Sequence, residues 1–252
     1  MKALVTGASS GIGRDIAKYL SKMGCDLVLV ARDKKGLQKV ASEIKTKTRV
    51  IAMDLSEPSN CMKLYKMVKK DDVSILVNNA GFGTFGRFTD TDLERELKMI
   101  DTNIKAVHIL TKLFVKDMKS KNRGYILNVS SSAAFQVGPL MASYYATKAY
   151  ILKLTTALNE ELRRDNSDVV VCTLCPGPVK TNFNKVANVE FELKSLSSDY
   201  VAKYGIDNMF KKKMIIIPGF YMKMLYFLSR FVPTKQVLKI VYNIQRRKRK
   251  EL

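Results

Sequence analysis

Short apolar runs alternate with amphipathic stretches over most of the chain. The runs predict buried strands, and the stretches between them place apolar residues three and four positions apart, as in Ile16, Ala17 and Leu20, which predicts helices. Strands that alternate with helices form parallel sheets with helices on both faces. We therefore expect an α/β fold with a doubly wound, mostly parallel, seven-stranded sheet. The expected strands are residues 2–6, 26–31, 48–53, 74–78, 124–130, 169–175 and 214–219.

The same pattern predicts the helices and the limits of the domain. The length of 252 residues and the 46% of hydrophobic residues are sufficient for one single domain with a large core. We expect residues 1–219 to form this domain and residues 220–252 to form a helical C-terminal extension. Beyond the helix with Leu20, helices are expected over about 34–45, from after Asp54 to Lys70, over 90–122 as one long helix or two joined helices, and from Ser143 onward.

The C-terminal tail carries much of the charge. The formal net charge is +21, and residues 211–252 hold twelve Lys or Arg against one acid, Glu251. The tail contains two amphipathic segments, at about 220–231 and 234–249. It could lie on a membrane surface with its cations on acidic head groups, dock on its own domain, or form an oligomer contact. Nucleic-acid binding is not expected, because residues 245–252 hold no aromatic residue among their cations.

Three further features bear on the location of the protein. A membrane span needs about 20 apolar residues in a row, and Lys223 and Arg230 interrupt the apolar part of the tail. The N-terminus leads directly into the first strand without a secretory signal. The C-x-x-C pair of Cys172 and Cys175 falls in a strand pattern, where residues three apart point to opposite faces. We expect a cytoplasmic protein, peripheral to a membrane if the tail binds one, with no metal site; His108 is expected to be structural.

A glycine-rich turn, Gly7 to Gly13, follows the first strand and precedes the first helix. Glycines in such a turn let backbone N–H groups approach a pyrophosphate, and the N-terminus of the helix stabilises its charge. The sequence therefore predicts a Rossmann-type dinucleotide site. The residues of the turn expected to bind the cofactor are Gly7, Ser9, Ser10, Gly11, Ile12 and Gly13.

The end of the second strand, Ala31-Arg32-Asp33, indicates which dinucleotide binds. A free ribose 2′-hydroxyl usually meets an acid at this position, whereas a 2′-phosphate needs space and a cation. Ala31 leaves the space and Arg32 supplies the cation, so NADP is expected in preference to NAD. Asp33 is a complication, because it could turn inward. Asp54 after the third strand could accept from an adenine amino group or cap the next helix.

The stretch from Asn128 to Lys148 holds the candidate chemistry. Tyr144 and Lys148 are four residues apart, so a helix places them on one face. A positive charge beside a phenol is expected to lower the pKa of Tyr144 toward neutrality, where a proton donor works best. Ser131 stands at the end of a strand and is expected to face Tyr144. Tyr145 points about 100° away along the helix.

Several motifs occur together in a fixed order. They are T-G-A-S-S-G-I-G at 6–13, N-N-A-G at 78–81, N-V-S-S at 128–131, Y-Y-A-T-K at 144–148 and C-P-G-P-V-K-T at 175–181. In order and spacing the chain resembles the classical short-chain dehydrogenase/reductase superfamily from Lys2 to about Gly219. The apolar, basic tail is similar to those of a branch that resembles fatty-acyl and sterol reductases.

The resemblance implies specific residues for catalysis and cofactor binding. The implied catalytic residues are Asn103, Ser131, Tyr144 and Lys148, in which Asn103 holds a water that links Lys148 to solvent. Residues 182–213 would include a lid over the substrate. The cofactor would also contact Arg32, Asp54, Leu55, Asn79, Ala80, Gly81, Tyr144, Lys148, Pro176, Gly177, Val179 and Thr181.

The function implied is an NADP(H)-dependent oxidoreductase that transfers hydride to a carbonyl of a small molecule. The substrate is expected to be a ketone on an apolar body, and the protein a homodimer or homotetramer like many superfamily members. The alternatives are an NAD-dependent alcohol dehydrogenase of the same family and a non-catalytic cofactor-sensing or scaffold protein. The residues expected to line an apolar pocket are Phe82, Phe85, Phe88, Phe135, Met141 and Phe183.

Overall fold

The computed structural model of the chain describes residues 1–181, 183, 195–229 and 231–246. Its centre is a seven-stranded sheet in the order β3-β2-β1-β4-β5-β6-β7, and every neighbouring pair of strands is parallel. The expected doubly wound α/β fold is confirmed, with a sheet that is wholly parallel. The strands are β1 (Lys2–Thr6), β2 (Asp26–Ala31), β3 (Thr48–Ala52), β4 (Ile75–Asn78), β5 (Tyr125–Val129), β6 (Val170–Leu174) and β7 (Ile215–Ile216).

Helices connect the strands and follow them in the chain. The α-helices are α1 (Gly11–Lys22), α2 (Lys34–Ser42), α3 (Pro58–Val68), α4 (Leu93–Ile100), α5 (Val107–Ser120), α6 (Ala142–Arg164), α8 (Ser198–Phe210), α9 (Phe220–Leu228) and α10 (Thr234–Arg246). Short 3-10 helices are η1 (Lys69–Asp71) and η3 (Ser132–Phe135), and η2 (Asp101–Ala106) is a π-helix. The stretch expected as one long helix or two is therefore α4, η2 and α5 in direct succession. Helix α2 ends at Ser42, three residues before its expected end.

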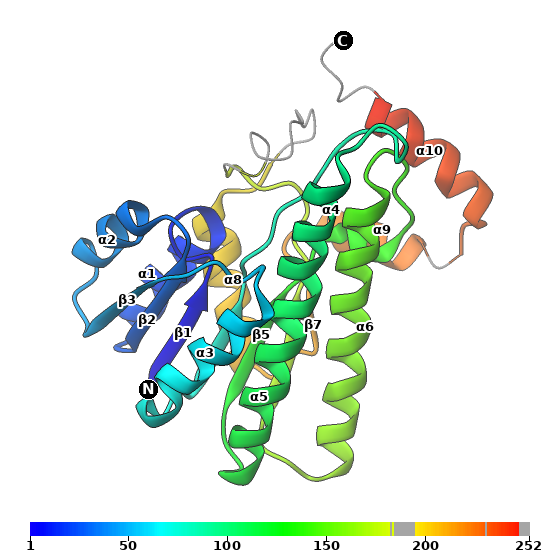
Figure 1. The fold of residues 1–252 in the computed structure, drawn as a ribbon. Helices are drawn as coiled ribbons and strands as arrows, with labels where there is room; N and C mark the ends of the chain where they lie inside the picture. The colour runs from blue at the N-terminus through cyan, green and yellow to red at the C-terminus, as the bar shows by residue number, and fades with distance from the viewer. Residues whose placement is uncertain (182, 184–194, 230, 247–252) are drawn as a thin grey trace.

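Successive side chains of a strand point to opposite faces of the sheet, which produces two separate hydrophobic cores. In β1, Ala3 and Val5 point to one face of the sheet and Leu4 to the other. Helices α1, α2 and α8 cover the first face, and α3, α5 and α6 cover the second. Figure 1 shows α5 and α6 as two long helices side by side, with α8 on the far side of the sheet. Both faces are thus buried, which explains the nearly continuous apolar runs of the strands.

The strand order reverses between β1 and β4. From β1 the chain builds outward through β2 and β3, then returns to place β4 on the other side of β1. In open α/β sheets, ligands bind in the crevice at the carboxyl ends of the strands, at such a switch point. The glycine-rich turn, the Asn-Asn-Ala-Gly motif and Ser131 all lie at this edge.

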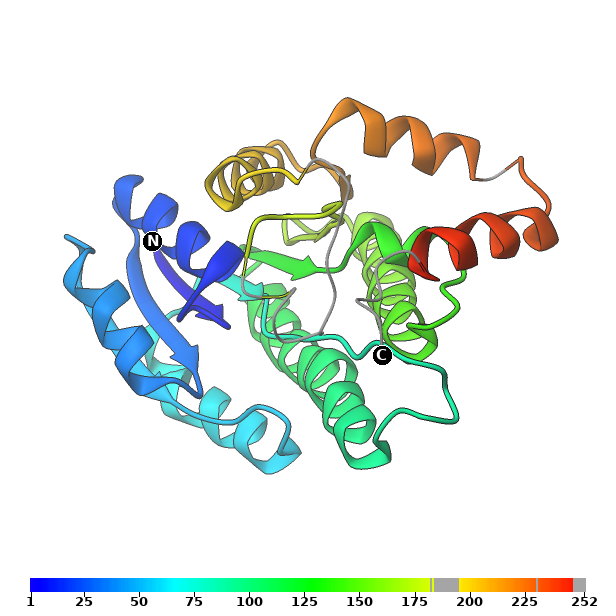
Figure 2. The ribbon, with the colours of Figure 1, turned by 90° about the horizontal axis from the view of Figure 1, so that it is seen from above.

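The tail folds back onto this edge of the domain. Figure 2 shows α9 and α10 as a hairpin, with α10 beside the first turns of α6. Met222 and Tyr226 of α9 pack against the domain, and the Tyr226 ring lies 4.3 Å from that of Phe135 between centroids. Of the alternatives for the tail, docking on its own domain is therefore observed. No helix in the described part of the chain has the length and apolar character needed to cross a bilayer.

The region expected to contain the lid, 182–213, divides into two parts. Residues 182 and 184–194 lie outside the described residues. From Ser198 onward the region is α8, whose residues Val201, Ile206 and Met209 are buried in the core. The described helix is thus one of the layers that cover the sheet.

Candidate active site

A cavity of about 1000 Å³ lies at the carboxyl edge of the sheet. The turns after β1, β2, β3, β4, β5 and β6 form one side of it, and α9 and α10 form the other. This volume is at the upper end of the about 300–1,000 Å³ that ordinary ligand sites occupy, so the cavity can hold a large ligand. All the expected catalytic and cofactor-binding residues line this cavity except Gly13 and Asn103.

The glycine-rich turn is shaped to let an anion approach its backbone. Gly7 has a φ of +64°, and a Cβ there would lie 2.7 Å from Asn79 Nδ2. Gly13 lies beneath the turn, where a Cβ would meet the Gly7 carbonyl oxygen at 2.4 Å, so its role is packing. Helix α1 begins directly after Ser10, which makes no side-chain cap, and its first turn has no acidic residue. The first-turn N–H groups and the helix dipole thus present positive potential to the cavity.

The end of β2 places a cation at the cavity, next to an acid that caps the following helix. The side chain of Arg32 is largely exposed, and its Nη1 lies 4.0 Å from Asp54 Oδ2. Asp33 caps α2 by accepting from Gly36 N at 3.0 Å, and it also borders the cavity. Asp54 accepts from Ser56 N and Ser56 Oγ, whereas the N-cap of α3 is Glu57. The helix-cap alternative for Asp54 is therefore wrong, and its carboxylate lines the cavity.

Three side chains of the Asn128–Lys148 stretch meet inside the cavity. Tyr144 is buried, and the Ser131 hydroxyl lies beside its phenol, where it lowers the pKa of that phenol. Lys148 Nζ donates to the carbonyl oxygen of Val129 at 3.0 Å and lies 5.9 Å from the Tyr144 ring centroid. A Cβ at Gly81 would lie 3.4 Å from Lys148 Nζ, so the glycine leaves room beside the ammonium. The hydroxyl pair and the ammonium thus face one space.

The expected lowering of the Tyr144 pKa is wrong for this geometry. Burial raises the pKa of Tyr144 well above its usual value, and the hydrogen bond from Ser131 offsets only part of that rise. Burial also lowers the pKa of Lys148 to about 8. Spacing along a helix places the two groups on one face, but burial is the largest cause of the pKa shift of each group. Tyr144 is therefore held in its neutral, proton-donating form.

Asn103 lies behind the cavity in the π-helical segment η2. Its Nδ2 donates to the Phe82 carbonyl at 2.9 Å and to Thr147 Oγ1 at 3.0 Å, while its Oδ1 accepts from Phe82 N at 3.1 Å. The side chain thus ties the turn after β4 to α6, and all of these contacts are to protein. π-Bulges of this kind are frequent at functional sites. Sequence periodicity gave no sign of the π-helix.

Ser130 and Tyr145 also border the cavity, but their hydroxyls are bonded to other groups. Ser130 Oγ donates to the Lys148 carbonyl at 2.8 Å, which fixes β5 to α6. The phenol of Tyr145 accepts from Gln245 Nε2 at 2.7 Å, and Gln245 is 1% exposed. No described residue bonds to Gln245 Oε1. This contact joins residues a hundred positions apart and anchors α10, and no local signal in the sequence reveals it.

The apolar wall of the cavity differs in part from the expected one. Phe82, Phe135, Met141 and Phe183 line it, whereas Phe85 packs behind them. Phe88 is 71% exposed and lies outside the wall, so that expectation is wrong. The residues that sequence reasoning missed come from the tail. They are Tyr221, Met222, Leu225, Tyr226, Leu228, Val232, Val237, Ile240, Val241 and Ile244.

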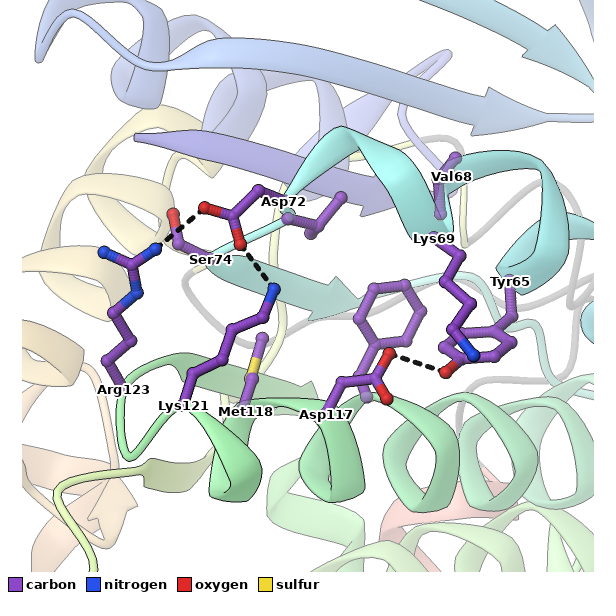
Figure 3. Close-up of a pocket in the computed structure, with 11 residues that line it drawn as sticks. Tyr65, Val68, Lys69, Asp72, Ser74, Asp117, Met118, Lys121 and Arg123 are labelled. Carbon is purple, nitrogen blue, oxygen red and sulfur yellow. Dashed lines mark hydrogen bonds and ion pairs between the residues drawn. The ribbon is translucent and has the colours of Figure 1, made fainter.

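A second cavity, of about 20 Å³, lies near the amino ends of β4 and β5. Figure 3 shows Asp72 paired with Lys121 and Arg123 there, and Tyr65 hydrogen-bonded to Asp117. Its volume is about that of one water molecule. Among the residues that the structure describes, no group of His, Cys, Asp or Glu side chains is arranged to hold a metal ion.

Known sequences that are similar to this chain belong to oxidoreductases. A sequence model of the family described as short chain dehydrogenase matches residues 1–190. An uncharacterized oxidoreductase of Staphylococcus epidermidis is 36% identical over 181 residues, 71% of this chain and 78% of that protein. The very-long-chain 3-oxoacyl-CoA reductase of Anas platyrhynchos is 29% identical over 251 residues, 95% of this chain and 78% of that protein.

Solved structures share the fold. A short-chain dehydrogenase from Sphingobium yanoikuyae in complex with NADPH superposes with a TM-score of 0.81 at 29% identity, over 87% of this chain and 88% of that chain. A 3-ketoacyl-(acyl-carrier-protein) reductase from Brucella melitensis complexed with NADH has a TM-score of 0.75 at 27% identity, over 86% of this chain and 94% of that chain. One of these structures thus holds NADPH and the other holds NADH.

Proposed function

Because the chain belongs to the short-chain dehydrogenase family, and is therefore an oxidoreductase that uses NAD(P), we propose that it is an NADP(H)-dependent reductase of ketones on apolar substrates. One observation carries this proposal. The neighbouring hydroxyls of Ser131 and Tyr144 face the same cavity as the glycine-rich turn and the uncapped N-terminus of α1. A carbonyl beside these hydroxyls is within reach of a dinucleotide bound at the turn.

The residues present fit a dinucleotide. The α1 N-terminus and Gly7 would hold the pyrophosphate, Asp54 and Leu55 the adenine side, and Asn79 to Gly81 the adjoining ribose. Pro176, Gly177, Val179 and Thr181 line the cavity where the nicotinamide end would lie. When bound, the nicotinamide supplies the hydride. The protein supplies position, charge and a proton.

Each of the four expected catalytic side chains has a proposed role. Tyr144, neutral because of its burial, donates its proton to the oxygen of the carbonyl as that oxygen becomes an alkoxide. Ser131 donates a hydrogen bond to the same oxygen, a contact of the oxyanion-hole type. Lys148 supplies positive charge below the phenol and binds the nicotinamide ribose. Asn103 positions the turn after β4 against α6, and a water held near it would resupply protons.

The proposed preference for NADP rests on Arg32. Its guanidinium lies at the cavity edge beside Ala31, while Asp33 is engaged at the α2 N-terminus. A charge-assisted hydrogen bond contributes about 1.5–3 kcal/mol. We expect Arg32→Gln to lower kcat/KM with NADPH about 10- to 100-fold and to change it little with NADH. Steady-state kinetics with both cofactors measure this, and a wild-type preference for NADH would contradict the assignment in favour of an NAD-dependent dehydrogenase.

The proposed substrate class rests on the apolar wall. Phe82, Phe135, Met141 and the tail residues enclose the space beside Ser131 and Tyr144. The name of the duck relative, a 3-oxoacyl-CoA reductase, supports an acyl body among the possible ketones. NADPH oxidation with a panel of short, long-chain, 3-oxoacyl and steroid ketones tests the proposal. Turnover of long-chain or steroid ketones in preference to short ones is expected, and no turnover of any ketone would favour a cofactor-sensing or scaffold role.

Further parts of the proposal concern the surroundings of the site. We expect residues 1–219 to act as the catalytic domain, with a lid in the part of 182–213 that precedes α8. A cytoplasmic location and a homodimer or homotetramer remain predictions, to be measured by cell fractionation and analytical ultracentrifugation. We also propose a peripheral membrane contact through the tail, which the arrangement of apolar side chains on α9 supports.

A further inference from the structure

Helix α9 presents an apolar stripe on the side opposite its docking face. Met222 and Tyr226 pack against the domain. At about 100° per residue, Phe220, Met224 and Phe227 fall on the opposite face of the helix. Phe220 is 83% exposed and Phe227 59% exposed. Large apolar side chains gathered in this way mark a surface that contacts another apolar phase.

The stripe continues into the cavity. Tyr221, Leu225 and Leu228 lie between the outward stripe and the docking face, and each is both exposed and part of the cavity wall. Ile240 and Ile244 of α10 are likewise exposed and line the cavity. An apolar path therefore runs from the outer surface of the hairpin to the space beside Tyr144.

The hairpin has cations but no acids. Residues 220–246 contain Lys223, Arg230, Lys235, Lys239 and Arg246 and no Asp or Glu. Lys235, Lys239 and Arg246 fall on the face of α10 opposite its buried residues Val241 and Gln245. A second copy of this hairpin would bring like charges together, whereas anionic lipid head groups would neutralise them.

We propose that the α9–α10 hairpin docks on the surface of an anionic bilayer and that the cavity takes its ketone directly from the lipid phase. The Phe220–Met224–Phe227 stripe enters the interface, and Lys235, Lys239 and Arg246 contact the head groups. The substrate then moves along Tyr221, Leu225 and Ile240 without crossing water. The uptake of the ketone from the lipid phase rests on the proposed reductase function. The docking of the hairpin on the bilayer does not.

Vesicle co-sedimentation tests the docking without reference to turnover. The full chain is mixed with phosphatidylcholine vesicles, with or without phosphatidylglycerol, at two salt concentrations. Wild-type protein is expected to bind the anionic vesicles, more weakly at high salt. Phe220→Ser combined with Phe227→Ser is expected to weaken binding at least about tenfold. Because neither residue lines the cavity, this variant should reduce a water-soluble ketone at the wild-type rate.

The matched control is Phe88→Ser, which removes an equally exposed phenylalanine far from the tail in sequence and outside the cavity wall. It should bind vesicles as the wild type does. Equal vesicle binding by the stripe variant and the wild type would overturn the proposal. A second outcome would also overturn it. In that outcome the wild type forms a dimer in ultracentrifugation, the stripe variant does not, and neither protein binds vesicles. Binding to an RNA oligonucleotide in place of vesicles would overturn it too.

The entry route has its own readout. With a long-chain ketone dissolved in anionic vesicles, wild-type turnover should exceed that of the stripe variant at least about tenfold, following the loss of binding. With a water-soluble ketone the two rates should agree. Vesicle binding without this difference in rate would contradict the entry route. Absence of turnover with every ketone would contradict the proposed function but leave the docking result standing.

Discussion

The chain contains two tyrosines with a lysine four residues later, and their surroundings differ completely. Lys148 Nζ lies 5.9 Å from the Tyr144 ring centroid, and Lys69 Nζ lies 5.7 Å from that of Tyr65. Tyr144 faces a cavity of about 1000 Å³, whereas Tyr65 borders one of about 20 Å³ (Figure 3). A spacing of four residues thus places a lysine beside a tyrosine ring at two positions in the chain. What distinguishes the candidate active site is space for ligands and a hydroxyl partner.

The partners of the two phenols explain the difference in chemistry. Tyr144 lies beside a neutral hydroxyl, that of Ser131, and both groups face the cavity. Tyr65 donates to the carboxylate of Asp117 at 2.5 Å, and burial together with this bond raises the pKa of Tyr65 to about 12. A phenol whose proton is held by a carboxylate has no free proton to give. The Tyr65 pair is therefore part of the packing between α3 and α5.

The largest expected effect comes from removing each phenol in turn. Tyr144→Phe should lower kcat/KM for ketone reduction about 10²- to 10⁴-fold, because the proton donor is lost. Tyr65→Phe should leave kcat/KM within about twofold and lower the melting temperature, because Asp117 loses a partner. Kinetics and thermal unfolding of both variants, with NADPH binding measured as a control, make the comparison. Comparable loss of activity in both would contradict the distinction.

The hydroxyl partner should have the next largest effect. Ser131→Ala removes the hydroxyl beside Tyr144 and the proposed contact to the substrate oxygen, and should cost about 10²- to 10³-fold in kcat. Ser130→Ala removes the bond to the Lys148 carbonyl and should cost less than about tenfold, with a loss of stability near 1 kcal/mol. The reverse order of activities would assign the catalytic role to Ser130.

Lys148 and Lys69 should differ in their effect on the pH dependence of ketone reduction. Burial lowers the pKa of Lys148 to about 8, while Tyr144 stays protonated because its pKa is raised. If the charge of Lys148 is required, kcat/KM for reduction should be level at lower pH. It should fall about tenfold per pH unit above a pH of about 8, as Lys148 loses its proton.

Two variants identify the lysine responsible. Lys148→Arg, whose guanidinium stays charged throughout, should remove this fall even if its overall rate is lower. Lys69→Met should leave the profile unchanged. A fall that persists in Lys148→Arg would assign the titration to another group.

The smallest effect is expected at the ion pairs of the small cavity. The hydrogen bond from Lys121 holds the pKa of Asp72 below its usual value, with a further contribution from Arg123. Asp72→Asn should lower the free energy of unfolding by at most about 1 kcal/mol, because the carboxylate is exposed. Since the folded pKa is depressed, this contribution is present above a pH of about 4 and is lost as the pH falls below it. Urea unfolding at two pH values measures it, and reduction should be unaffected.

Local patterns allowed much of the site to be predicted. The glycine-rich turn, Arg32 and the serine-to-tyrosine stretch follow strands whose order along the chain determines where their ends meet. The features that were missed depend on burial or on distant contacts. The pKa of Tyr144 reflects desolvation, which spacing does not report. The bond of Gln245 to Tyr145 and the wall built by α9 and α10 join parts of the chain that no local pattern links.

Transfer of deuterium tests the central claim most directly. Wild type, Tyr144→Phe and Tyr65→Phe are each incubated with a long-chain ketone and NADPH deuterated at the transferable position of the nicotinamide, and the alcohol is analysed by mass spectrometry. The wild type and Tyr65→Phe should produce alcohol carrying one deuterium, and Tyr144→Phe almost none while still binding NADPH. Labelled alcohol formed equally by Tyr144→Phe, or formed by none of the three proteins, would contradict the assignment of this site.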